Sequence, residues 1–139
     1  MEIFTEKISI STGNDLDIKD ITEDVSKIVK DSMIKDGIVN IFSAGSTCGI
    51  TTMEFEPGLK KDFRTALEKI APSNIDYEHH KTWNDENGKS HIRSMFIKPE
   101  LTVPIEDGKP YLGTWQQIVF IDFDVPARER TILVKVLGK

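Results

Sequence analysis

Two patterns of hydrophobic residues near the start of the chain predict a strand followed by a helix. Residues 3–10 mix apolar and polar positions and lead into the turn-forming stretch 11–15. Apolar residues then recur at helical spacing from Ile21 to Met33. Asp20 is placed to cap this helix, and Gly37 can end it. We interpret the apolar stripe as a face of the core rather than a partner-binding surface.

The middle of the chain predicts two strands and a second helix. Residues 38–42 and 50–55 are the strands, and the stretch 43–49 between them consists of small residues. An apolar stripe at helical spacing runs from Leu59 to Ile70, directly after a Pro-Gly pair. Pro72 ends this second helix, because proline cannot continue the hydrogen-bonding pattern.

The C-terminal half predicts mostly strands, at residues 92–97, 101–105, 115–123 and 131–137. In the third of these, Ile118 and Phe120 point to one face, whereas Val119 and Ile121 point to the other. A strand that is apolar on both faces is covered on both. The helices would supply one cover, and a second sheet or a neighbouring subunit the other. The order of elements predicts an α+β fold, with two main helices packed on a largely antiparallel sheet.

Composition limits the class of protein and its partners. The 139 residues fit one domain, 1–139, with 38% hydrophobic and 29% charged residues. A net charge of −5 argues against a nucleic-acid or anionic-membrane binder, because both need a basic surface. No apolar run is long enough to cross a bilayer, and the N-terminal residues lack the features of a signal peptide. With Cys48 as the only cysteine, we expect a cytoplasmic protein without disulfides.

The candidate chemistry gathers in the segment 72–90, which follows neither the helix nor the strand period. All three histidines fall at or near this segment, and His79, Asp85 and His91 could form a two-histidine, one-carboxylate set. Such a set leaves positions on a metal open for water or substrate. The alternative is a polar loop whose histidines make ordinary hydrogen bonds. If the backbone is extended, His80 points away from His79, so only one of the two would join the cluster.

Other polar groups fit an anion site less specifically. Ser46 and Thr47 lie in the small-residue stretch, where hydroxyls and backbone amides could hold a phosphate, although a plain turn is the simpler interpretation. Arg128 and Arg130 could reach one anion from the same face of a strand, or form salt bridges at a solvated edge. For Cys48 we favour a small buried residue over a nucleophile, since no signature of a cysteine enzyme surrounds it.

Three sets of residues carry a resemblance to a known family. The most specific is Leu112-Gly113-Thr114-Trp115-Gln116, preceded by the Val-Pro-Ile stretch at 103–105 and by Gly108. The others are Tyr77 and His79 with Trp83, Asp85, Asn87 and His91, and the run from Gly45 to Thr51. On these motifs the chain resembles the YjbQ-like family, also called secondary thiamine-phosphate synthases.

The resemblance implies a sandwich-like α+β domain that assembles as a homotrimer. It further implies that His79, Asp85 and His91 form a polar pocket, in some members around a metal, with Trp115 and Gln116 lining it. Asn87, Ser46, Thr47 and the two arginines would then bind a small phosphorylated metabolite. Many members have a histidine where this chain has Gly45, and a Gly-x-Ser where it has Lys98-Pro99-Glu100. These departures suggest an archaeal-type branch.

Two functions follow as hypotheses. The first is a metal-assisted enzyme, with weak thiamine-phosphate synthase activity implied by the resemblance. That reaction joins hydroxymethylpyrimidine diphosphate to thiazole phosphate and releases pyrophosphate. A histidine-rich site suits zinc better than magnesium, which prefers oxygen ligands, so hydrolytic or lyase-like chemistry fits at least as well. The second hypothesis is a non-catalytic trimer that binds a phosphorylated metabolite or a metal.

Overall fold

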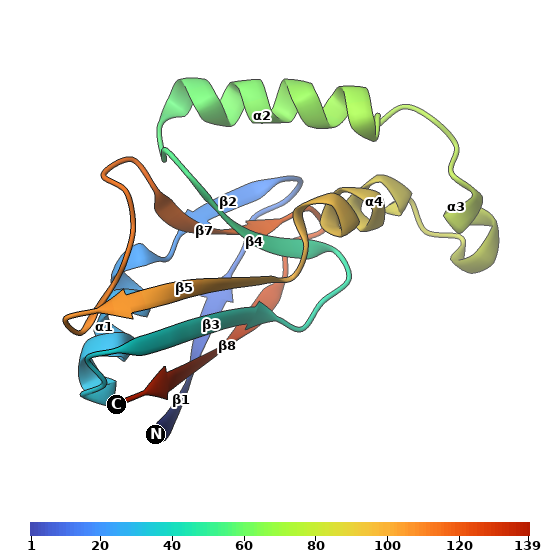
Figure 1. Ribbon diagram of the computed structural model, residues 1–139. Coiled ribbons are helices and arrows are strands. Elements are labelled where there is room, and N and C mark those ends of the chain that lie inside the picture. The colour runs from blue at the N-terminus through green and yellow to red at the C-terminus, as the bar shows by residue number, and fades with distance from the viewer.

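Two antiparallel sheets pack against each other, and helices lie along their open faces and ends (Figure 1). The computed structural model describes residues 1–139. The larger sheet contains, in spatial order, β1 (Glu2–Ser11), β8 (Glu129–Gly138), β3 (Gly37–Ser43), β5 (Glu100–Glu106) and β6 (Lys109–Pro110). The smaller sheet contains β2 (Asp17–Asp20), β7 (Gln117–Asp122) and β4 (Cys48–Met53). The α+β fold predicted from the sequence is confirmed, with two sheets in place of one.

The main core lies between the two sheets and the first helix, α1 (Thr22–Ser32). Val25, Ile28 and Val29 are buried on one face of α1, as the helical spacing predicted. A second, smaller core lies on the other face of the smaller sheet, under α2 (Pro57–Ile70). Burial of these apolar side chains is the main source of the stability of the fold.

Strand β7 has both faces covered, as predicted. Ile118 and Phe120 belong to the core between the sheets, whereas Val119 and Ile121 belong to the core under α2. Both covers come from the same chain. The two apolar faces of β7 therefore need no neighbouring subunit to explain them.

The first helix is capped close to where the sequence indicated, but it ends earlier. The Asp20 carboxylate accepts hydrogen bonds from the backbone amide and the hydroxyl of Thr22, which satisfies a donor of the first turn. The helix stops at Met33, which adopts the left-handed conformation with φ of 64°. Gly37 was expected to end this helix and instead begins β3.

The strand predicted at residues 92–97 is wrong, because this stretch belongs to a helix, α4 (Gly88–Ile97). The buried face of α4 is polar: Ser90, Arg93 and Ser94 are buried, while Met95 and Phe96 are 76% and 63% exposed. Each of the three buried polar side chains donates a hydrogen bond to a backbone carbonyl. Hydrophobic periodicity cannot detect a helix whose inward face carries hydrogen bonds in place of apolar contacts.

The long segment expected to lack regular structure contains one short helix, α3 (Glu78–Trp83). It follows Tyr77 and ends at Asn84, which is left-handed with φ of 54°. The short strand β2 was also missed from the sequence. None of the four helices is both long and apolar enough to cross a membrane.

Candidate functional site

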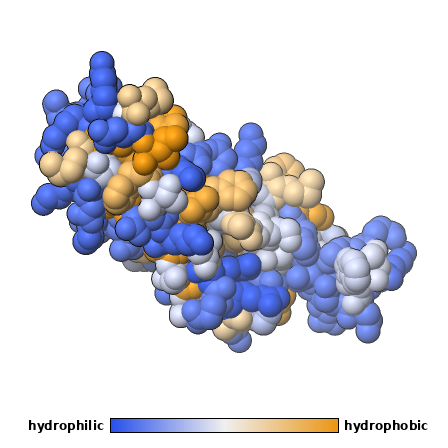
Figure 2. Space-filling view, turned by 90° about the horizontal axis from the view of Figure 1, so that it is seen from below, coloured by the Kyte–Doolittle hydropathy of each residue, from blue (hydrophilic) through white to orange (hydrophobic).

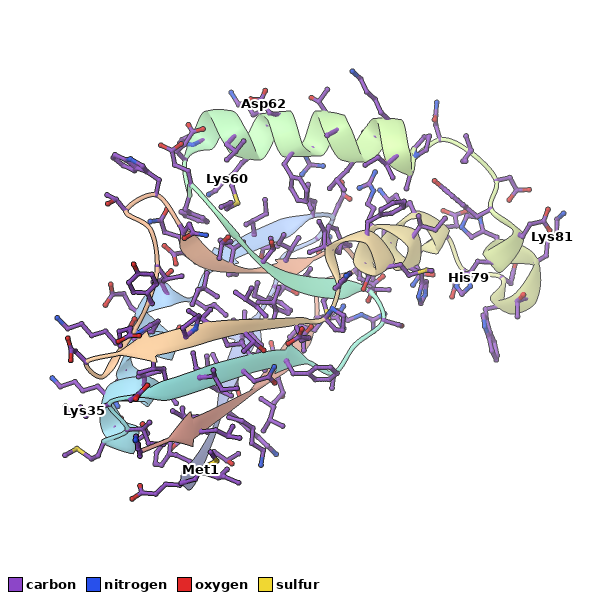
Figure 3. All side chains as sticks on the ribbon, viewed as in Figure 1. Met1, Lys35, Lys60, Asp62, His79 and Lys81 are labelled. Atoms are coloured by element: carbon purple, nitrogen blue, oxygen red, sulfur yellow. The ribbon has the colours of Figure 1, made fainter.

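Two helices and the turn between them place the predicted histidine cluster at one end of the molecule. His79 lies on α3, Asp85 on the connecting turn and His91 on the first turns of α4. The turn is tight because Asn84 adopts the left-handed conformation, which asparagine tolerates better than most residues. Figure 3 shows His79 at the end of the molecule farthest from Met1 and Lys35.

The structure brings the three predicted residues together. Atom Nε2 of His79 lies 3.2 Å from Oδ1 of Asp85. The rings of His79 and His91 are tilted against each other with centroids 4.4 Å apart. No set of three or more His, Cys, Asp or Glu side chains has an arrangement that could hold a metal ion without a change of side-chain position. The cluster is therefore assembled, but its side chains do not converge on one point.

Three polar atoms of this cluster are shielded from solvent and have no hydrogen-bond partner: Nε2 of His79, Oδ1 of Asp85 and Oδ1 of Asn87. The approach of His79 to Asp85 does not have the alignment of a hydrogen bond, despite the 3.2 Å distance. Buried polar atoms are nearly always satisfied in folded proteins. A cation or a donor group from outside the chain would satisfy these atoms.

A buried carboxylate, Asp124, supports the cluster from behind. Its Oδ1 accepts a hydrogen bond from Nδ2 of Asn87 at 3.3 Å, and its Oδ2 accepts one from the Thr47 hydroxyl at 3.1 Å. Arg128 donates to the same Oδ2 through Nε. Although burial raises the pKa of Asp124, the hydrogen bonds from the Val125 amide and the Asn87 side chain, together with Arg128, hold it below its ordinary value. Asp124 is thus charged at neutral pH.

Asp122 and Asp124 were missed in the sequence, although a signal for them exists. Asp122 is the last residue of the strongly apolar strand β7, and Asp124 follows it after Phe123. Charged residues at the end of a buried strand are costly unless they are paired, so their presence there indicates a partner. The structure supplies that partner as the two arginines predicted for an anion site.

Both arginines are already engaged. Arg130 donates from Nε and one terminal nitrogen to the two oxygens of Asp122, each at 2.9 Å, and from the same terminal nitrogen to Thr47. Arg128 pairs with Asp124 at 3.0 Å. Two carboxylates therefore neutralise two guanidinium groups. This arrangement matches the salt-bridge alternative more closely than a free anion site.

The histidines differ in their surroundings. Burial, followed by the neighbouring His79, lowers the pKa of His91, and the opposing effects of Asp124, Asp85 and the Ser46 backbone are smaller. His91 is accordingly neutral at pH 7. His80 differs from His79 because its Nε2 accepts a hydrogen bond from the Gly88 amide at 3.1 Å, while its Nδ1 lies 3.4 Å from the exposed Asp76 carboxylate. Only His79 of the adjacent pair joins the cluster, although the backbone is helical rather than extended.

The remaining predicted residues lie in two places. Ser46 is exposed beside His91, while Thr47 is buried with its hydroxyl occupied. Trp115 is 70% exposed and Gln116 bonds to the Gly113 amide, at the far end of β7. The length of that strand separates them from Asp124 by roughly 25 Å, at about 3.3 Å per residue. Within one chain, Trp115 and Gln116 therefore do not line the histidine cluster.

Cys48 is buried and free. Burial raises the pKa of its thiol, and the hydrogen bond to Ser43 and the charge of Arg130 only partly oppose this. A thiol with a raised pKa is a poor nucleophile at neutral pH. The structure thus favours a small buried residue at this position.

Comparison with known proteins gives consistent similarities. The family described as "UPF0047 protein YjbQ-like" matches residues 6–139. A UPF0047 protein of Methanothermobacter thermautotrophicus is 38% identical over 139 residues, covering 100% of this chain and 95% of its own length. One from Methanocaldococcus jannaschii is 37% identical over 133 residues, covering 95% of this chain and 93% of its own. A crystal structure of a YbjQ-like protein of unknown function from Sulfolobus solfataricus has a TM-score of 0.93 at 35% identity, with 99% of both chains covered.

Proposed function

Because this chain belongs to the UPF0047 YjbQ-like family and its histidine cluster holds unsatisfied polar atoms, we propose that it is a metal-assisted enzyme. The expected kinship with archaeal members is confirmed. The observation that carries the proposal is the set of three shielded atoms without partners, on His79, Asp85 and Asn87. Two of these atoms carry lone pairs only, so the site attracts a cation more strongly than an anion.

The spacing of two of these atoms supports a metal of zinc type. With bonds of about 2.0–2.1 Å, two ligands of a tetrahedral ion lie about 3.3 Å apart. Nε2 of His79 and Oδ1 of Asp85 are 3.2 Å apart. His91 would complete the set after a change of its side-chain torsions. Imidazole and carboxylate ligands favour zinc over magnesium.

A metal bound here would lower the pKa of a bound water or polarise a substrate oxygen. The protein's own residues would prepare the site around it. Asp124 orients Asn87 through its hydrogen bond, and the paired arginines hold Asp124 and Asp122 in place. His91, neutral at pH 7, can bind the metal through one ring nitrogen. Trp83, four residues after His79 on α3 and 71% exposed, offers a flat surface for a ring.

For the substrate we propose a small phosphorylated metabolite. Thiamine-phosphate synthesis is one candidate, but it requires stabilisation of a leaving diphosphate. Arg128 and Arg130 are neutralised by Asp124 and Asp122, so a free anion-binding pair is missing. Metal-assisted hydrolytic or lyase-like chemistry therefore fits the cluster better than diphosphate transfer. A non-catalytic metal- or metabolite-binding protein is the alternative.

The test is turnover by zinc-loaded protein, first with hydroxymethylpyrimidine diphosphate plus thiazole phosphate, then with 4-nitrophenyl phosphate. We expect His79→Ala and His91→Ala each to lower turnover at least a hundredfold, because each removes a ligand. Asp124→Asn, which weakens the support of Asn87, should cost about tenfold. His80→Gln is the matched control and should retain activity, since its side-chain oxygen can still accept from the Gly88 amide. Equal turnover in all four variants and wild type would exclude catalysis by this cluster.

A further inference from the structure

A cavity lies between α2 and the smaller sheet, away from the histidine cluster. Its volume is about 370 Å³, and most of its lining is apolar. The lining side chains that matter here come from β4 and α2: Met53, Leu59, Phe63 and Ala66, with Ile121 of β7 at the base. Asp62 on α2 and His79 on α3 mark the two sites in Figure 3, at well-separated places.

The two halves of α2 are buried to different extents. Leu67 is buried against the sheet, and Arg93 of α4 donates to the carbonyl of Ala71, directly after the helix. In the first half of α2, Phe63 packs on the core under the helix, but Leu59 and Phe63 are both only half-buried. The apolar stripe of the helix thus faces a space that the chain itself does not fill.

The lining decides what can occupy this space. An apolar cavity holds ordered water poorly, because water there finds no hydrogen-bond partners. Its volume lies at the lower end of the range for small-molecule sites, which is too little for a helix or strand of a partner. A small, mainly apolar or aromatic molecule is therefore the occupant that fits.

The polar groups that line the cavity indicate which charge a bound molecule would carry. Asp62 is the only charged side chain that lines the cavity, and it lies on the exposed side of α2. Thr51 and Thr52 add hydroxyl groups on β4. We propose that this cavity binds a small apolar or aromatic molecule bearing a protonated amine, with the ring between Phe63 and Met53 and the amine at Asp62. The site shares no residue with the histidine cluster and does not depend on the function proposed for it.

The experiment is a titration of the full-length protein with 2-phenylethylamine, followed by NMR of the methyl groups of Met53, Ala66 and Ile121. Neutral 2-phenylethanol and anionic phenylacetate are the matched probes. We expect saturable shifts at these methyl groups, with the amine binding up to about fivefold more tightly than the alcohol, as for an exposed ion pair. Phenylacetate should bind most weakly. Asp62→Asn should remove the preference for the amine and leave binding of the alcohol unchanged.

Two further variants test the location. Ala66→Phe places a ring in the cavity and should abolish binding of the amine while the melting temperature stays the same or rises. Thr65→Phe, at the preceding position of α2 and outside the lining, should bind the amine normally. Shifts that persist in Ala66→Phe, or no shifts with any probe in wild type, would overturn the proposal. A loss of oligomer mass in Ala66→Phe, with no binding in wild type, would overturn it by showing that a second copy covers this space.

Discussion

At the scale of residues, the partners of polar side chains decide the roles that these side chains can play. His79 and His80 are neighbours of the same type, yet Nε2 of His79 is unsatisfied while Nε2 of His80 accepts a hydrogen bond from the Gly88 amide. The sequence suggested a set of His79, Asp85 and His91, and the structure places His79 beside both of the others. The sequence could not reveal Asp124 as their support, since that contact joins Asn87 to a residue far along the chain.

The hydrogen bonds of Glu68 predict how the stability of the fold depends on pH. Hydrogen bonds from the hydroxyl and amide of Ser73, and then the charge of Arg93, hold the pKa of Glu68 at about 2, against an ordinary value of 4.5. A lowered pKa in the folded state stabilises the protein above pH 4.5, and this stability is lost as the pH falls toward 2. Because Glu68 is partly exposed, we expect only about 1 kcal/mol from it.

The measurement is urea unfolding of wild type and Glu68→Gln between pH 2 and pH 7. The variant should be less stable at pH 7 by about 1 kcal/mol, and the two curves should meet near pH 2. Glu78→Gln, which changes an exposed glutamate of α3, is the control and should follow wild type. A stability difference that is constant across this pH range would contradict the assigned role.

At the scale of elements, α4 shows why the hydrophobic pattern of a sequence does not predict every helix. Strands β1, β3, β5 and β8 were predictable because their inward positions are apolar and alternate. The inward positions of α4 are Ser90, Arg93 and Ser94, and its exposed positions include Met95 and Phe96. The hydrophobic residues of α4 therefore include exposed ones, and its buried face is polar. A hydrophobic pattern consequently does not identify this stretch as a helix.

We predict that Arg93→Met destabilises the protein despite adding an apolar side chain. Arg93 is 1% exposed and bonds to the Ala71 carbonyl and to Glu68, so it joins α4 to the end of α2. Its loss leaves that carbonyl without a partner and should cost about 2 kcal/mol of unfolding free energy. Met95→Lys, on the exposed face of the same helix, should change stability by less than about 0.5 kcal/mol. Denaturant unfolding measures both, and equal effects would refute the role of Arg93.

At the scale of the whole molecule, the outer face of the larger sheet carries an exposed apolar row. The strand register aligns Ile3, Leu137 and Ile38 across β1, β8 and β3, and Phe42 lies farther along β3 on the same face. Ile3 is 66% exposed, Ile38 41% and Phe42 39%. In Figure 2, orange surface is visible over the half of the molecule toward the termini. Exposed apolar side chains that line up across neighbouring strands are a feature of protein interfaces.

We propose a homotrimer as the assembly, and this face is the candidate for its interface. Ile38→Glu places a charge in the middle of the row and should convert the trimer to a monomer, because burying an unpaired carboxylate is costly. Size-exclusion chromatography with light scattering measures the mass. Met95→Lys, exposed on α4 and outside this face, should leave the mass unchanged. A trimeric Ile38→Glu variant would place the interface elsewhere, and a monomeric wild type would exclude the trimer.

The most direct test of the central proposal is the metal content of purified protein that carries no affinity tag, alongside His79→Ala, His91→Ala and His80→Gln. We predict close to one zinc or similar transition ion per chain in wild type and His80→Gln, with a strong loss in the other two variants. Circular dichroism confirms that each variant is folded. Metal-free wild type after supplementation with zinc, or full metal content in His79→Ala and His91→Ala, would contradict the assignment.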